Sequence, residues 1–386
     1  SLDISGDIDV DGTTNLDVVD IDGAVDMAST LQVDGAITFS STLNGLDILA
    51  DATNFVDSIL ISQNASTGTL DSASSNTGLG DTVFSALTSG DFNTAVGFKA
   101  LEDHTTGASN TAIGAQALMN NTTAANNVAV GISALKTNTT GASNVAIGKN
   151  ALDANTTAGN NTAVGADALG ANTTGEFNIA IGSNAVDANT TANYNIGIGY
   201  NALTTEASGE KNVAIGHAAL EDSNGGNFNT AVGYGSLRNS TTADNNTAFG
   251  YHTLVTNTTG ASNTAVGFGS LDANTTGGFN VGLGQSALTD NTTGASNVAI
   301  GVSALGTNST ADFNTAVGRD SLAANTTGSS LVAVGKGALD ANTTSSNSTA
   351  VGTDALGANT TGSDNTALGY AALRDNTTAS NNTAVG

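Results

Sequence analysis

Three carboxylates at alternating positions form the arrangement in this chain that comes nearest to a metal site. Asp7, Asp9 and Asp11 stand before Gly12, and this spacing matches the first half of a helix–loop–helix calcium loop. Such a loop takes its bidentate Glu from the twelfth position, where this chain has Val18. We therefore favour a solvated strand edge that ends in an Asp-Gly turn, and calcium binding by the three Asp residues stays open as an alternative.

The histidines offer neither a catalytic group nor a metal cluster. His104, His217 and His252 fall at three different positions of a 17-residue repeat, so they do not line up with one another. We expect all three on the surface. Ser and Asp are abundant, but without a neighbouring His no nucleophile and base form a pair. The sequence therefore predicts a protein that is not an enzyme, with no catalytic residue, no metal ligand and no cofactor.

The other carboxylates and the repeated amides have structural interpretations. Glu102, Asp103, Asp153 and Asp340 lie in turn segments, where we expect them to keep the molecule soluble rather than to form an acid–base pair. Recurring Asn-Thr-Thr triplets satisfy the N-glycosylation sequon, but Asn at a tight turn is the favoured interpretation. These triplets include those at Asn121, Asn138, Asn155, Asn172 and Asn189.

The composition disfavours several kinds of partner. The 386 residues include 48 Gly, no Cys and no Pro, and 34 acidic residues stand against 8 basic ones for a net charge of −26. Without Cys there is no disulfide framework, and with so little Lys and Arg we expect no nucleic-acid partner. No apolar run approaches the ~20 residues of a membrane-spanning helix, so we expect no membrane insertion. Because the chain starts at Ser1 and stops inside a repeat at Gly386, we expect a piece of a longer protein.

A period of 17 residues runs through most of the chain. The string Asn-Thr-Ala-Val-Gly at Asn93 has relatives that begin every 17 residues from Asn76 to Asn382, which makes 19 copies without insertion or deletion. Position 1 is Asn in all copies but two, position 2 is β-branched, position 3 is Ala or Gly, and position 4 is almost always aliphatic. Position 5 is always Gly, and position 9 is nearly always Leu. An unbroken period means that each copy occupies an equivalent place in one stack.

Short β-branched runs between turn residues indicate strands. The predicted fold is all-β, a repetitive parallel β-solenoid or β-roll in which each 17-residue coil has two short strands and their turns. Coils stacked at ~4.8 Å would form a rod about 90 Å long. We expect Gly at position 5 to supply a corner conformation and the Asn residues of position 1 to form an amide ladder.

The alternation of side chains along a strand predicts two faces. Positions 2 and 4 share one face, and positions 1, 3 and 5 share the other. We expect positions 2 and 4 to fill the interior together with the Leu of position 9, for example Leu152. Positions 1, 3 and 5 would then form a flat outer face of Asn, Ala and Gly, by which partner chains approach a shared axis. Packing of this flat face inside its own coil is the alternative.

The chain divides by pattern into three parts. Residues 1–62 form an acidic stem of short strands and Asp-Gly turns without Lys or Arg, residues 63–75 form a transition, and residues 76–386 form the array. Each stem strand has a single apolar face, so we expect several copies of the stem to wind round one another.

Two stretches resemble known fibre proteins. The segment 6–16 (Gly-Asp-Ile-Asp-Val-Asp-Gly-Thr-Thr-Asn-Leu) and its echo at 31–38 look like the shaft repeats of phage tail fibres, especially those of marine phages. The array, with Asn-Thr-Ala-Val-Gly at 93–97 and Ala-Leu at 100–101, is similar to arrays of tail-fibre and adhesin-like proteins. It also resembles the head repeats of trimeric autotransporter adhesins, which fold as parallel β-rolls. These resemblances imply a homotrimeric fibre on a virion or outside a cell, and they transfer no catalytic residue.

The leading hypothesis is a non-enzymatic structural fibre, the shaft of a phage tail fibre with a role in host recognition. Its partners would be further copies of the chain and a host receptor or glycan. A cell-surface adhesin whose repeats bind a receptor or glycan is the alternative. Ice binding is less favoured, because it calls for two Thr separated by one residue on a flat strand face. In this chain the Thr residues of positions 13 and 14 are adjacent, and position 2 mixes Thr with Val and Ile.

Overall fold

The computed structural model describes residues 47–52, 55–62 and 67–386, which are all-β and contain no helix. The chain divides into two compact units, residues 1–41 and 42–386. The first unit, with Asp7, Asp9 and Asp11, lies outside the described residues, so the calcium alternative is not addressed by the structure. The strands are β1 (Asp47–Ala52), β2 (Phe55–Ser62), β3 (Ala73–Ser74), β4 (Thr77–Leu79), β5 (Thr94–Val96), β6 (Thr111–Ile113), β7 (Val128–Val130), β8 (Val145–Ile147), β9 (Thr162–Val164), β10 (Ile179–Ile181), β11 (Ile196–Ile198), β12 (Val213–Ile215), β13 (Thr230–Val232), β14 (Thr247–Phe249), β15 (Thr264–Val266), β16 (Val281–Leu283), β17 (Val298–Ile300), β18 (Thr315–Val317), β19 (Val332–Val334), β20 (Thr349–Val351), β21 (Thr366–Leu368) and β22 (Thr383–Val385).

The first two strands begin the sheet of the array. β1 and β2 form an antiparallel hairpin, in which Asp47 pairs with Ser62. β2 then pairs in parallel with β3 and with β4, where Ile59 lies beside Thr77. Because β4 belongs to the first 17-residue copy, the sheet extends into the range that the sequence pattern assigned to the stem.

Each full copy forms one coil of a parallel β-solenoid, as predicted, and 19 strands, β4 to β22, are stacked, the last from a copy of five residues. Equivalent residues lie side by side, as where Ile179 of β10 pairs with Ile196 of β11. Each coil has one strand, at positions 2–4, and not the two that we predicted. The turns make a second strand unnecessary because they also hydrogen-bond to the next coil. The N–H of Leu118, for example, donates to the carbonyl of Ala134 at 3.0 Å.

The interior is filled from the opposite strand face to the one that we predicted. The Ala of position 3 is fully buried in coil after coil, whereas positions 2 and 4 are half-buried or exposed. Our inward assignment of positions 2 and 4 was therefore wrong, and the inward assignment of position 9 is confirmed, since Leu152 is 0% exposed. The coil is too thin for two layers of branched side chains. Where position 3 is Gly197, an added Cβ would lie 2.5 Å from Cγ2 of Val186, so some coils lack room even for a methyl group.

Two columns of buried amides run along the interior, a column being the residues at one position in successive coils. At position 1, Oδ1 of Asn93 accepts the backbone N–H of Asn110 (2.9 Å), and Nδ2 of Asn110 donates to the carbonyl of Ala124 (2.9 Å). This confirms the predicted ladder. A second ladder follows position 12, where Nδ2 of Asn138 donates to Oδ1 of Asn121 at 3.0 Å. These bonds satisfy the buried amides and fix each coil over the next one.

The corners of the coil use backbone conformations with positive φ. The Gly of position 5 has a φ between +123° and +142° from Gly80 to Gly369, as we predicted for a corner. An added Cβ at Gly148 would lie 2.2 Å from the carbonyl oxygen of Gly165 in the next coil, so the column also permits close contact between coils. The Leu of position 9 adopts a left-handed conformation as well, for example φ 53° at Leu152.

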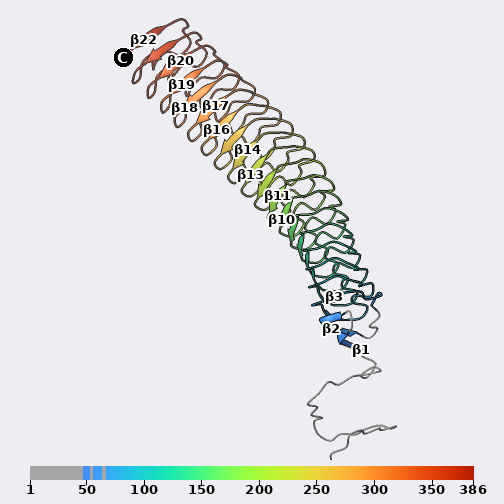
Figure 1. The fold of residues 1–386 in the computed structure, drawn as a ribbon. Coiled ribbons are helices and arrows are strands. Elements are labelled where there is room, and N and C mark those ends of the chain that lie inside the picture. The colour runs from blue at the N-terminus through green and yellow to red at the C-terminus, as the bar shows by residue number, and fades with distance from the viewer. Residues whose placement is uncertain (1–46, 53–54, 63–66) are drawn as a thin grey trace, which may run out of the picture. The chain divides into compact units, whose positions relative to one another are not determined.

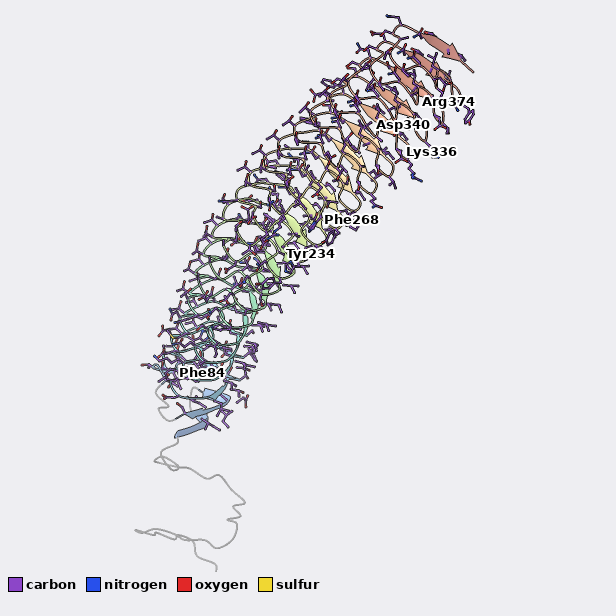
Figure 2. The ribbon with its side chains drawn as sticks, turned by 180° about the vertical axis from the view of Figure 1, so that it is seen from behind. Phe84, Tyr234, Phe268, Lys336, Asp340 and Arg374 are labelled. Atoms are coloured by element: carbon purple, nitrogen blue, oxygen red, sulfur yellow. The ribbon has the colours of Figure 1, made fainter. Side chains whose placement is uncertain are left out.

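Within residues 67–386 the stack of coils bends gently (Figure 1). The strand arrows follow the inner, concave side of this bend, and the turns lie on the outer side. Figure 2 gives the same arrangement from behind, with Tyr234 and Phe268 labelled beside the strands. The two views therefore agree that one side of the array is made by the strands.

Candidate interaction surface

One side of the array carries exposed side chains that soluble monomers usually bury. Side chains at positions 2 and 4 point away from the interior, because they alternate with the buried position 3. Positions 6 and 17 flank the strand on its two sides in the sequence. We call the side chains of positions 17, 2, 4 and 6 the strand-side surface. Among its exposed apolar members are Ile113, Ile147, Ile181, Ile215, Leu283, Ile300 and Leu368, all at position 4.

The aromatic residues of the array are concentrated on this surface. Beyond Phe84, which is buried at position 9 of the first coil, residues 76–386 include 13 Phe and Tyr residues. Every one of the 13 is exposed and lies at position 17, 4 or 6. They are Phe92, Phe98, Phe177, Tyr194, Tyr200, Phe228, Tyr234, Phe249, Tyr251, Phe268, Phe279, Phe313 and Tyr370. This concentration of exposed aromatic side chains makes the strand-side surface the candidate interaction surface.

Five consecutive coils place their rings next to one another at position 6, with the pair Tyr200 and His217 tilted by 32° and the other three pairs stacked. The ring centroids of Tyr200 and His217 are 5.3 Å apart, those of His217 and Tyr234 are 4.9 Å apart, and those of Tyr234 and Tyr251 are 5.4 Å apart. Phe268 continues the stack, with its ring 5.4 Å from that of Tyr251. Because the stacked rings cover one another's faces, it is mainly the ring edges and the Tyr hydroxyls that face outward.

Charge is distributed unevenly around the coil. Of the 34 acidic residues, 13 precede residue 76, which leaves 21 in the array. Only two of the 21, Asp81 and Asp364, lie on the strand-side surface, and positions 2 and 4 carry no charge in any coil. The surface also holds four of the eight basic residues of the chain, Lys149, Lys211, Arg319 and Lys336. A strongly acidic chain thus has one apolar, weakly basic side.

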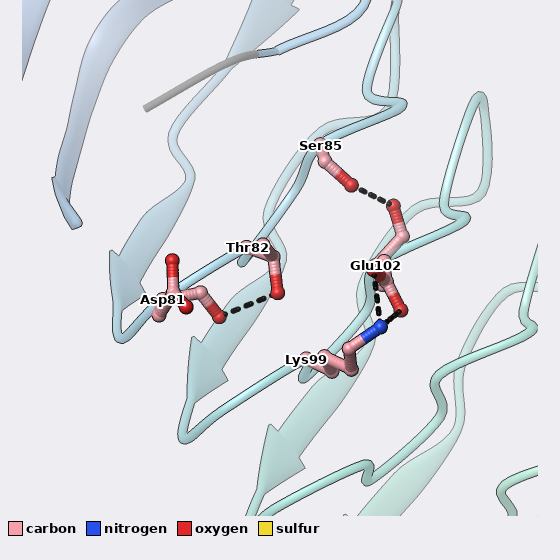
Figure 3. A network of polar contacts seen from close by, with 5 residues as sticks. All are labelled: Asp81, Thr82, Ser85, Lys99 and Glu102. Carbon is pink, nitrogen blue, oxygen red and sulfur yellow. Dashed lines mark hydrogen bonds and ion pairs between the residues drawn. The ribbon is translucent and has the colours of Figure 1, made fainter. Parts of the chain in front are cut away.

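The carboxylates that we expected in turns are there, away from the strand-side surface. Glu102 at position 10 pairs with Lys99, with Nζ 2.9 Å from Oε1, and its carbonyl accepts the hydroxyl of Ser85 (Figure 3). Thr82 Oγ1 donates to the carbonyl of Asp81 in the same view. These contacts lie within one coil or between neighbouring coils, and they stabilise the turns.

Some carboxylates of the turns gather around a glycine. A Cβ added at Gly170 would lie 2.7 Å from Oδ1 of Asp187 and 3.8 Å from Oδ1 of Asp153, so the two carboxylates approach from the coils on either side. Burial raises the pKa of Asp153, and the charge of Asp167 raises it further. Burial likewise raises the pKa of Asp340. Within the described residues, no group of three or more His, Cys, Asp or Glu side chains is arranged to hold a metal ion.

The histidines occupy two kinds of site. His217 lies in the ring stack of the strand-side surface and is exposed, whereas His252, at position 7, is half-buried and packs its ring beside those of Tyr234 and Tyr251. His104 is fully buried, so our expectation that it lies on the surface was wrong. It takes the place of Asn in the position-12 ladder: Nε2 donates to the carbonyl of Gly107 at 2.8 Å, and Nδ1 accepts from Nδ2 of Asn121 at 3.0 Å. Burial lowers the pKa of His104, which favours the neutral ring that this pattern requires.

The sequon asparagines belong to the same interior ladder. Asn121, Asn138, Asn155, Asn172 and Asn189 are each 0% exposed, and their Nδ2 atoms donate inside the coil. A glycan on any of them would require the coil to open. The structural interpretation of the triplets is therefore confirmed.

The position-12 ladder is interrupted at one place. Glu206, Ser223 and Ser240 replace Asn in three successive coils, and all three are fully buried. The Glu206 carboxylate accepts N–H groups of Ser208 and Gly225 and the hydroxyl of Ser223. Since a carboxylate cannot donate as an amide does, Oδ1 of Asn189 in the preceding coil has no hydrogen-bond partner among the described residues.

The surface could have been found from the sequence by sorting residues by repeat position. Aromatic side chains look scattered along the chain and gather at positions 17, 4 and 6 only when the copies are aligned. Sorting also shows that no coil has Thr at both positions 2 and 4, so the outer strand face lacks the paired Thr on which the ice-binding interpretation depended.

Comparison of the chain with family models, curated proteins and solved structures finds no match. The part of the chain that the structure describes has no helix long and apolar enough to cross a membrane. The geometry of the molecule is therefore the basis for assigning it a function.

Proposed function

We propose that the chain is a non-enzymatic structural fibre, the shaft of a phage tail fibre that holds a recognition element away from the particle. The observation that carries the proposal is the uninterrupted stack of 18 full coils that ends in the strand of a nineteenth copy. In such a stack each coil contacts its neighbours only, and 18 steps of ~4.8 Å give a rod of about 86 Å. A length that is set by the number of coils suits a spacer.

The proposal includes a homotrimer that is located on a virion or outside a cell. Its support is the resemblance of segment 6–16 and of the array to fibre repeats, together with the apolar, aromatic-rich strand-side surface. The acidic surface elsewhere fits an exposed shaft, since like charges keep such rods apart.

Deletion of whole coils tests the spacer role. Removal of residues 144–228 deletes five coils and joins Ser143 to Asn229, which preserves the period. We expect a rod about 24 Å shorter in negative-stain electron micrographs, with its ends unchanged. Removal of residues 144–151 is the control, because it breaks the period and should disturb the stack. A compact particle, or a length that does not follow the number of coils, would refute the spacer role.

Immunogold labelling with an antibody to the chain tests the location. Label along the tail fibres of virions supports the shaft, whereas label confined to a bacterial cell surface supports the alternative, an adhesin. The exposed ring stack favours that second candidate as a receptor or glycan site, because Tyr combines apolar area with a hydroxyl. Glycan binding by the whole chain that is lost in Tyr234→Ala would assign this role to the stack.

A further inference from the structure

We propose that the strand-side surface is the contact between copies of this chain, which wind round a common axis with these surfaces inward. The proposal deepens the fibre role and rests on it only for the identity of the assembly as a shaft. The strand-side surface takes the role that the sequence analysis gave to the flat Asn-Ala-Gly face. That face cannot contact another chain because positions 1 and 3 are buried inside the coil.

The composition of the surface is that of an interface. The cores of protein interfaces are enriched in Tyr and Phe and depleted in Asp and Glu, whereas charged residues are placed at the rim, as Lys149, Lys211 and Lys336 are at the flanking positions 6 and 17. This surface holds all 13 Phe and Tyr residues of the array beyond Phe84 and two of the 21 acidic residues of the array. Their exposure is substantial, from 44% at Phe177 to 74% at Tyr370.

The extent of the surface points to a second copy as the occupant. The strand itself, at positions 2–4, spans about 10 Å, and over a stack of about 86 Å it alone presents roughly 860 Å², which the flanking positions 17 and 6 enlarge. Stable interfaces bury about 800 Å² on each partner, and exposed apolar patches of monomers rarely exceed a few hundred Å². Positions 2 and 4 keep their apolar or Thr character in every one of the 19 copies. Only a partner of equal length and equal period matches all of them, and another copy of the chain is such a partner.

The bend of the array fits chains that wind round one another. A rod that winds about an axis is curved toward that axis, so its inner side is concave, as is the seam of a helix in a coiled coil. The strands lie on the concave side of the array in both views (Figures 1 and 2). The acidic residues at the other positions of the coil repel an approach from the outer sides, which directs contact to the strands.

Cysteine cross-linking of the whole chain tests this contact, because the chain has no Cys of its own. Val232→Cys places a thiol at position 4, and Thr242→Cys places one at the exposed position 14. Under mild oxidation we expect at least tenfold more covalently linked chains from the Val232→Cys variant. Equal linking by the two variants, or preferential linking by Thr242→Cys, would overturn the proposal.

Sedimentation of charged variants gives an independent readout. Ile147 and Phe249, both at position 4, are 40% and 57% exposed, so Asp at these two sites leaves the interior of the coil intact. We expect the parent chain to sediment as an assembly and the Ile147→Asp/Phe249→Asp variant to shift to the monomer with an unchanged circular dichroism spectrum. The Thr140→Asp/Thr242→Asp variant carries the same charge at the exposed position 14, away from the strands, and should stay assembled.

The outcomes separate this inference from the fibre role. A parent chain that is a monomeric rod at tens of micromolar would overturn the contact but leave the spacer role in place. An assembly that is linked by Val232→Cys and dispersed by the two position-4 Asp residues supports the contact, even if labelling then places the chain elsewhere than on tail fibres.

Discussion

Adding carbon atoms to neighbouring residues of one strand tests which strand face is inside. Ala146 of β8 is at position 3 and 0% exposed, while Val145 beside it is at position 2 and half-buried. We expect Ala146→Val to destabilise its coil and Val145→Ile to be nearly neutral. The expectation from the sequence, with position 2 inside, gives the opposite order.

The magnitude follows from the room around position 3. An added Cβ at Gly282 would lie 2.5 Å from Oγ of Ser270, and at Gly197 it would lie 2.5 Å from a methyl group of Val186. Position 3 therefore accommodates at most one methyl group, and the two carbons added by Ala146→Val overpack the coil at a cost of about 1–3 kcal/mol. Val145→Ile adds its carbon on the outer side, where substitutions change stability by about 0.5 kcal/mol or less.

Hydrogen exchange measured by mass spectrometry is the suitable assay, because a stack of coils can open locally without unfolding as a whole. A cost of 1–3 kcal/mol corresponds to about 5- to 150-fold faster exchange in peptides from residues 144–177. Peptides from residues 331–365 serve as the internal control. Faster exchange in Val145→Ile with unchanged exchange in Ala146→Val would refute the inward assignment of position 3.

Three further changes have defined outcomes. Burial holds the pKa of His104 below its ordinary 6.5, so the folded chain keeps the ring neutral at a pH where the unfolded chain protonates it. The free energy of unfolding should therefore fall by up to about 1.4 kcal/mol per pH unit as the pH drops below 6.5. Denaturation curves of His104→Asn should lack this pH dependence. Gly148→Ala should unfold its coil, which circular dichroism would detect as a loss of β signal. Gly269→Ala, at φ +61° with no described atom within 4 Å of the added Cβ, should lower the free energy of unfolding by only about 1 kcal/mol. Glu206→Asn supplies the missing donor to Asn189 and should slow local hydrogen exchange about tenfold.

The repeat made the fold predictable. An unbroken period of 17 residues requires equivalent coils. The invariant Gly of position 5 indicates a backbone conformation that only Gly adopts easily, and the structure confirms it with φ +139° at Gly148. The position-1 amide ladder was likewise predictable, because an Asn column in a stack can only hydrogen-bond to itself and to the backbone. The number of strands in each coil was not predictable, since turns and strands make similar coil-to-coil hydrogen bonds in a stack.

The facing of the strand was not predictable by the usual rule. Alternation separates positions 2 and 4 from position 3, but it does not say which face is inside. The assumption that the more apolar face is buried fails in this chain because the interior is narrow. It is occupied by Ala at position 3, Leu at position 9 and amides such as Asn138, and Val145 or Ile147 would not fit. The burial of His104 was unexpected because the polar pattern around position 12 is typical of an exposed turn.

The outward facing of positions 2 and 4 also bears on the proposed contact between copies of the chain. Burying a Val, Ile or Phe side chain contributes about 1.5–3 kcal/mol, and most of these residues in the array lie outside the coil. The interior is stabilised instead by Ala, Leu and hydrogen-bonded Asn, which align the coils but bury little apolar area in each. A chain selected only for stability as a monomer would gain nothing from Phe279 or Tyr234 on its surface, where apolar side chains favour aggregation. Their confinement to one side of the coil, together with the near exclusion of carboxylates from that side, is explained if association of the chains buries them.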